Sequence, residues 1–157
     1  MTVEVYTDAS TREDAYTVSY QIYSDKYSAI CRKYYKKKND NNVAEMMAIE
    51  IALKHLSFLY RCRGFEITIY TDNKNAVELM NKTFISNKYK KNKEELGSLL
   101  KNFKSCEFVH VKAHTKSQDI HSKRNCLADK LCRESHSKKN NKFYLLYDYN
   151  DRNKLKN

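Results

Sequence analysis

Two acidic residues end two similar apolar segments of the chain. Residues 6–8 and 70–72 both read Tyr-Thr-Asp, so that Asp8 and Asp72 each close one segment. If the strands that carry them are neighbours, the two carboxylates face each other at one edge of a sheet. Like charges at close range repel, and this arrangement therefore requires a shared proton or a bound metal ion.

Two further acids and a histidine are candidates for the same site. Glu45 is near the start of the helix that is predicted after the third strand. Asp129 follows Asn125 by four residues, so both lie on one face of the last predicted helix, beside apolar side chains. His114 follows the fifth predicted strand, and a histidine near carboxylates can transfer protons close to neutral pH.

Each acid also has an ordinary structural interpretation. Asp8 can open a turn, and Asp72 can cap the helix that follows it. Glu45 completes an Asn-x-x-Glu pattern that resembles a capping box with Asn42 as the N-cap. Asp129 can be a solvated acid on the helix surface. The residues alone leave these alternatives open.

The elements that must position these side chains follow from periodicity. Alternating apolar residues predict strands, and apolar residues three or four apart predict helices. Strands are expected at 3–8, 15–24, 27–36, 65–71 and 106–112, and helices at 43–60, 74–82, 94–103 and 124–135. Tight turns predict an antiparallel meander of the first three strands. A strand reached through a helix is parallel to its neighbour, so Asp8 and Asp72 are expected at one sheet edge.

The predicted fold class is α/β, with a five-stranded mixed sheet flanked by helices. Residues 1–136 are expected to form one domain, followed by a basic C-terminal extension at 137–157. The apolar cluster at 143–147 is expected to dock on the domain, and the last residues are expected to fray.

The amino-acid composition limits the classes of binding partner and the cellular compartment that can be expected. The net charge of +11 over 157 residues predicts an anionic partner, nucleic acid first and an acidic membrane second, although a Lys-, Asn- and Tyr-rich chain can also reflect an AT-rich genome. No apolar run is long enough to span a membrane, and the N-terminus does not read as a signal peptide. Five cysteines without a C-x-x-C pair predict free thiols in a reducing compartment. A cytoplasmic monomer is therefore expected.

The order of these residues resembles the type 1 ribonuclease H family. The resemblance covers residues 1 to about 135, and its motifs, specific only as an ordered set, are 6–10, 41–48, 70–72, 111–114 and 125–131. It implies an RNase H-like fold and an endoribonuclease that hydrolyses the RNA strand of RNA/DNA hybrids, leaving a 5′-phosphate and a 3′-hydroxyl.

The resemblance also implies roles for the candidate residues. Asp8, Glu45, Asp72 and Asp129 become the catalytic carboxylates that hold two divalent ions, and His114 assists proton transfer or product release. Oxygen ligands suit Mg²⁺, with Mn²⁺ as an alternative. Two such ions activate the attacking water and stabilise the leaving oxygen.

Contacts with the hybrid are implied in the same way. Asparagine amides both donate and accept hydrogen bonds, as a 2′-hydroxyl in the minor groove requires, and lysines at 36–38 and 88–93 are expected near phosphates. The expected nucleic-acid-binding residues are Ser10, Asn41, Asn42, Lys74, Lys88, Lys90, Lys91 and Asn125.

The chain departs from the family pattern in several places. Ala9 stands where glycine is usual, and Lys74 stands where glutamine is common. The segment 112–129 is longer than in compact members, with Asp119 and His121 inserted, and the basic protrusion is short and lacks tryptophan. None of these departures changes the four acids.

Two other functions remain open. A DNA nuclease or resolvase on the same fold agrees less well with the Asn41-Asn42 pair. A non-catalytic hybrid-binding module agrees less well with four acids, because a protein that only binds an anion gains nothing from clustered negative charge.

Overall fold

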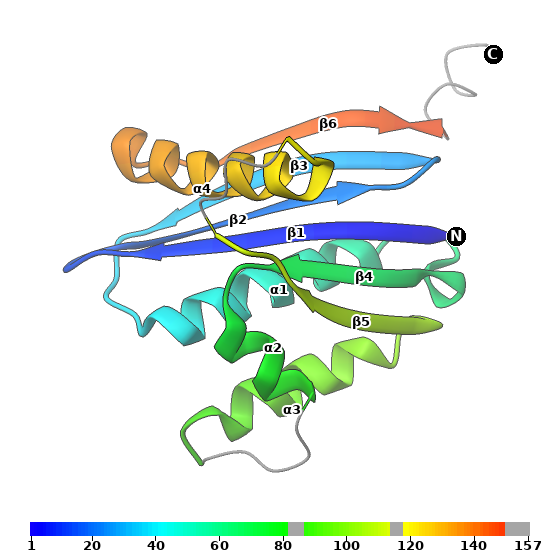
Figure 1. The fold of residues 1–157 in the computed structure, drawn as a ribbon, viewed down its shortest axis with the longest axis horizontal. Coiled ribbons are helices and arrows are strands. Elements are labelled where there is room, and N and C mark those ends of the chain that lie inside the picture. The colour runs from blue at the N-terminus through cyan, green and yellow to red at the C-terminus, as the bar shows by residue number, and fades with distance from the viewer. Residues whose placement is uncertain (82–86, 114–117, 150–157) are drawn as a thin grey trace.

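The computed structural model describes residues 1–81, 87–113 and 118–149, and Figure 1 shows a mixed sheet with helices on both faces. The described strands are β1 (Thr2–Thr11), β2 (Tyr16–Tyr23), β3 (Tyr27–Tyr35), β4 (Glu66–Thr71), β5 (Ser105–His110) and β6 (Lys142–Asp148). The described helices are α1 (Asn41–Ser57), α2 (Lys74–Asn81), α3 (Lys90–Leu100) and α4 (Ile120–Lys138), with 3₁₀ turns at Cys62–Gly64 and Asn87–Tyr89.

The strand order across the sheet is β5-β4-β1-β2-β3-β6. β1, β2 and β3 form the predicted antiparallel meander, and β4 and β5 add to it in parallel. The predicted parallel pairing of the first and fourth strands is therefore confirmed. Within the described residues, no helix has the length and apolar content that crossing a membrane requires.

The main hydrophobic core lies between the sheet and α1. Apolar residues of α1, among them Ile49 and Leu53, are completely buried against Val5 and Ile69 of the central strands. α3 adds Leu96 to the same cluster. This packing holds the first turns of α1 beside the end of β4 and the adjacent part of β1. β1 itself continues to Thr11, paired with β2, so the predicted end of the first strand at residue 8 is wrong.

The face of β2 that lies against α4, away from the main core, is polar but also buried. The side chains of Thr17, Ser19 and Gln21 donate hydrogen bonds to backbone carbonyls of α4, at 3.1, 2.8 and 2.7 Å respectively. The alternating pattern correctly predicted the strand β2. The prediction that this strand is only half-buried was wrong, because both of its faces are covered. The polar face is covered because helix carbonyls have a second lone pair that can accept these donors.

α1 begins earlier than its apolar spacing predicts. Asp40 is the N-cap, and its Oδ1 accepts from the backbone N–H groups of Asn42, at 2.9 Å, and Val43, at 3.2 Å. The predicted Asn42 cap and the capping box with Glu45 are therefore wrong, and Glu45 lies in the second turn. A carboxylate is the stronger acceptor at the positive end of the helix. The helix also ends at Ser57, because Phe58 and Tyr60 turn into solvent.

The described sheet has six strands rather than the predicted five. The apolar cluster at 143–147 docks as β6, which pairs antiparallel with β3 around an irregularity between Ser28 and Ala29. α4 is also longer than the predicted 124–135, because Asp119 caps it at Ser122. The expected boundary at 136/137 thus falls inside α4, and the division into domain and extension stays a prediction.

Arg32 ties β3 to the connection between α4 and β6. Its side chain is 2% exposed, and Nη1 donates to Ser135 Oγ, at 2.9 Å, and Asn140 Oδ1, at 2.9 Å. Glu134 is a more distant ion-pair partner, at 3.9 Å from Nε. This buried guanidinium therefore joins β3 to the end of α4 and to the connection that leads into β6.

Replacing Arg32 with Leu is expected to lower the free energy of unfolding by about 3 kcal/mol, because charge-assisted bonds are lost and buried polar groups lose their partner. Urea unfolding followed by circular dichroism measures this change. The matched control is Arg63→Leu at an exposed arginine, which is expected to change stability by less than about 0.5 kcal/mol. Equal effects of the two substitutions would refute the structural role of Arg32.

Candidate active site

The parallel pairing of β1 and β4 places the two Tyr-Thr-Asp segments in register. Tyr6 pairs with Tyr70 and Thr7 pairs with Thr71. The two tyrosine rings stack, with centroids 4.7 Å apart and planes 13° apart. Each acid follows the last paired threonine, so the predicted meeting of Asp8 and Asp72 at one edge is confirmed.

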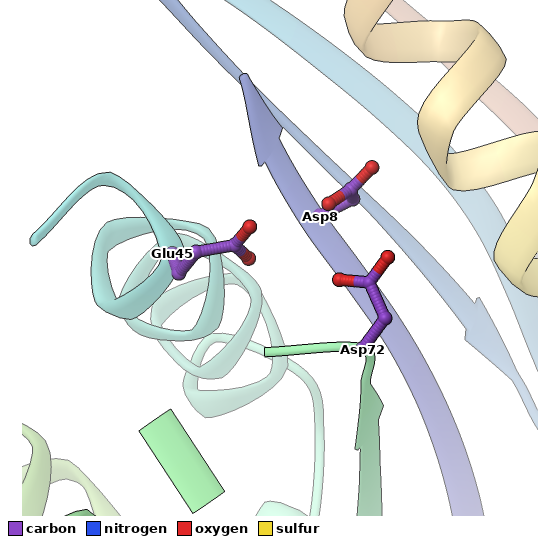
Figure 2. Close-up of side chains that lie close together, drawn as sticks. All are labelled: Asp8, Glu45 and Asp72. Atoms are coloured by element: carbon purple, nitrogen blue, oxygen red, sulfur yellow. The ribbon is translucent and has the colours of Figure 1, made fainter. Parts of the chain in front are cut away.

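Three carboxylates converge at this edge. Asp8 on β1, Glu45 on α1 and Asp72 after β4 each offer an oxygen, and these oxygens all lie within 4.8 Å of one another. Figure 2 shows the Glu45 side chain reaching from α1 toward the two aspartates. Asp8 is 5% exposed and Glu45 is 4% exposed. We call these three residues the acidic triad.

The acidic triad is electrostatically strained. Burial, followed by the charge on Asp72, raises the pKa of Asp8 to about 8. Burial, followed by the charges on Asp8 and Asp72, raises the pKa of Glu45 well above its ordinary value. Both causes penalise the ionised carboxylate, and a cation between the oxygens would remove both penalties.

The donor set fits a hard divalent cation. Glu45 Oε2 is buried and has no hydrogen-bond partner among the described residues. A buried polar atom without a partner is costly, and clustered carboxylate oxygens are the ligands that Mg²⁺ and Mn²⁺ prefer. The acidic triad therefore supports a metal site, in agreement with the sequence-based expectation.

Asp129 lies outside the acidic triad. It is on α4, where its Oδ2 is 3.1 Å from Nε of Arg133, one helical turn away. Its charge nevertheless contributes to the raised pKa of Asp8, which places it near that residue. The role of Asp129 as a fourth ligand stays a prediction.

His114 lies outside the described residues, and its predicted role stays a prediction. A different histidine, His110, was missed by the sequence reasoning. It ends β5, is exposed, and donates from Nε2 to the backbone carbonyl of Asp72 at 3.2 Å. The available sequence signal was its position near the C-terminal end of the predicted strand 106–112; the structure ends this strand at His110 itself.

A polar network borders the acidic triad on the side of α1 and α3. The Tyr89 hydroxyl donates to Asp40, at 3.4 Å, and accepts from Asn42 Nδ2, at 3.3 Å. Asn42 in turn accepts from Asn73, at 3.2 Å, the residue that directly follows Asp72. Lys88 binds Asp40 Oδ2 at 3.0 Å. Asp40, Asn73 and Tyr89 were not predicted as site residues.

The other predicted nucleic-acid contacts occupy varied positions. Ser10 is half-buried, and its backbone carbonyl accepts from His136 at 3.0 Å. Asn125 is buried on α4, which leaves little of its amide exposed. Four of these other residues are exposed, namely Asn41, Lys74, Lys90 and Lys91. Asn41 Oδ1 also accepts a long hydrogen bond from Thr11 Oγ1, at 3.4 Å.

The family model described as RNase H matches residues 1–137 of the chain. No curated protein sequence matches significantly. Among the solved structures of similar fold are three whose sequence identities to this chain support a shared fold only. RNase H1 from the halophilic archaeon Halobacterium salinarum NRC-1 is 19% identical, with a TM-score of 0.72 over 88% of this chain and 99% of that chain.

LC11-RNase H1, solved in complex with an RNA/DNA hybrid, is 20% identical, with a TM-score of 0.69 over 84% of this chain and 94% of that chain. The N-terminal RNase H domain of a Mycobacterium tuberculosis protein, solved as a fusion, is 18% identical, with a TM-score of 0.68 over 85% and 92% of the two chains. The expected α/β, RNase H-like fold is confirmed.

Proposed function

Because the chain belongs to the RNase H family, we propose that it is a metal-dependent endoribonuclease that hydrolyses the RNA strand of RNA/DNA hybrids. The observation that carries this proposal is the buried acidic triad, which fits a site for divalent ions. The proposed products are a 5′-phosphate and a 3′-hydroxyl.

Asp8, Glu45 and Asp72 would hold the ions, with Asp129 as the proposed fourth ligand. When bound, two Mg²⁺ ions would lower the pKa of an attacking water and stabilise the leaving 3′-oxygen. The protein contributes defined positions for the carboxylates, since Asp8 projects from β1, Glu45 from α1, and Asp72 directly follows β4. His114 is proposed to move a proton or to assist product release.

The substrate is proposed to lie across the N-terminus of α1 and the start of α3. Asn41 and Asn42, the first two residues of α1, would contribute their side-chain amides. Lys90 and Lys91, the first two residues of α3, are exposed. Lys88 is already bound to Asp40, so a phosphate must compete with that carboxylate. The net charge of +11 would attract the hybrid from a distance.

The decisive experiment is a cleavage assay with an end-labelled RNA/DNA hybrid in Mg²⁺ or in a chelator. Cleavage of the RNA strand is expected in Mg²⁺ only, with duplex RNA and duplex DNA of the same sequence resistant. Preferential cleavage of duplex DNA would instead support a resolvase-type nuclease. Binding of the hybrid without any cleavage would support a non-catalytic module.

Tyr89 is expected to position the substrate-binding asparagine rather than to act in the reaction. Tyr89→Phe removes the hydroxyl that links Asp40 to Asn42, so KM for the hybrid should rise roughly threefold while kcat is retained. Steady-state kinetics measure both constants. Tyr60→Phe at an exposed tyrosine is the control. A fall in kcat at unchanged KM would contradict this role.

A further inference from the structure

The hydrogen bonds between β2 and α4 form a regular ladder on the face of the sheet opposite to α1 (Figure 1). The donors are three alternate residues of the strand, and the acceptors are three carbonyls spaced four residues apart on the helix. In donor–acceptor order they are Thr17 to Cys132, Ser19 to Ala128 and Gln21 to Arg124. Two strand residues advance about 6.8 Å and four helix residues about 6.0 Å, so one donor reaches each successive turn of α4.

This ladder determines where α4 lies along β2. The three donor side chains of β2 are all 0% exposed, and a buried donor without a partner is costly. A hydrogen bond requires its acceptor at one position, whereas an apolar surface tolerates sliding. In α4, which is described along its whole length, Leu131 is the only large aliphatic residue among the buried ones. The hydrogen bonds therefore fix the register of α4 more than apolar packing does.

Ser19 is the step of the ladder that lies beside the acidic triad. It pairs with Asp8 across β1 and β2. Its Oγ donates at 2.8 Å to the carbonyl of Ala128, the residue directly before Asp129, and accepts from the Cys132 thiol at 3.4 Å. A slip of α4 by one turn would move Asp129 by about 5.4 Å, which exceeds the 4.8 Å within which the oxygens of the acidic triad lie.

We propose that Ser19 is a positioning residue of the proposed nuclease site and holds α4 in the register that brings Asp129 beside Asp8. The inference rests on the proposed function, because Asp129 is the proposed fourth ligand. Ser19 contacts neither ion nor substrate and acts only through Asp129. The ion pair of Asp129 with Arg133 cannot have this role, since both residues are on α4.

Other contacts of α4 with the sheet are farther from Asp129. His121 binds the Tyr6 hydroxyl, and His136 donates to the Ser10 carbonyl. Both histidines are about two helical turns from Asp129. They keep α4 on the sheet when Ser19 is replaced, so the variant is expected to fold with the helix only slightly displaced.

Calorimetric titration of Mg²⁺ into the full chain, together with hybrid cleavage kinetics, tests the proposal. Ser19→Ala should raise the dissociation constant for Mg²⁺ roughly tenfold and lower kcat roughly tenfold, because misplaced metal ligands typically cost this much. KM for the hybrid should change by less than about twofold, since no substrate contact is removed.

The same substitution in an Asp129→Asn background shows whether Ser19 acts through Asp129. In that background Ser19→Ala should change the dissociation constant for Mg²⁺ by less than about twofold, because the group that Ser19 positions is already absent. This measurement needs no catalytic activity.

Tyr20→Phe is the matched control. Tyr20 is the next residue of β2, on the other face, and its hydroxyl bonds His55 Nδ1 at 2.8 Å. Its loss should lower the melting temperature about as much as Ser19→Ala does and leave the Mg²⁺ affinity unchanged.

A second pair of variants keeps the test decisive if Ser19→Ala does not fold. Thr17→Val removes another step of the ladder and should weaken Mg²⁺ binding roughly threefold. Thr17→Ser keeps the hydroxyl and should retain the parent affinity.

Three outcomes would overturn the positioning role alone, in a parent chain that binds Mg²⁺ and cleaves the hybrid. They are an unchanged Mg²⁺ affinity in Ser19→Ala, an equal loss of affinity with and without Asp129, or an equal loss in Tyr20→Phe. A parent chain that neither binds Mg²⁺ nor cleaves the hybrid would overturn the proposed function as well.

Discussion

Replacing Asp8 with Asn is expected to reduce hybrid cleavage by about a thousandfold or more, while the protein remains folded. Asp8 contributes one of the three converging oxygens, and an amide cannot provide the negative charge that holds a divalent ion. In a chelator the variant should melt at a higher temperature than the parent protein near pH 8, because one of three mutually repelling buried acids is gone.

Single-turnover cleavage in Mg²⁺ and thermal melting in a chelator measure the two effects. The control is Asp14→Asn, which removes an exposed acid from the turn between β1 and β2 and should change neither quantity. If Asp8→Asn retained more than about a tenth of the parent rate, the acidic triad would not be the catalytic site.

The second large effect is a dependence of metal-free stability on pH. Asp8 has an ordinary pKa of 3.8, and in the folded protein the pKa is about 8. Between these values the folded state retains a proton that the unfolded state has lost. A rise in pH through this window therefore destabilises the folded protein, and the loss is complete above about pH 8.

Divalent ions should reverse this trend. Mg²⁺ binds the ionised carboxylates, so the rise in melting temperature on adding Mg²⁺ should be larger at pH 8.5 than at pH 5.5. Differential scanning fluorimetry with chelator or with Mg²⁺ at the two pH values measures this difference. In Asp8→Asn the difference should shrink, and an undiminished difference would assign the effect to other groups.

The alignment of the two Tyr-Thr-Asp segments was predictable because it depends on local rules. Alternation identifies the strands of Asp8 and Asp72, and a helical connection requires parallel pairing. Glu45 was predictable as a member of the site only through its order in the chain, because its spacing also fitted a capping box. The structure decides between these alternatives by the backbone of Asp40, which is extended at φ −69° and ψ 138°.

β6 and the polar network were not predictable for a different reason. An apolar run such as 143–147 has no period that distinguishes a strand from a docked loop, so pairing with β3 decides its conformation. The contacts of Tyr89 with Asp40 and Asn42 join residues nearly fifty positions apart. No local pattern specifies contacts over that separation.

The sequence by itself determined the first five strands, the parallel pairing of β1 with β4, and the identities of the acids that follow the two paired threonines. Only the tertiary structure decided that Asp8, Glu45 and Asp72 converge within 4.8 Å while Asp129 binds Arg133. Periodicity determines which way a side chain points from its own element. Desolvation and charge repulsion depend on the distances between elements, and those distances are set by packing of α1 on the sheet.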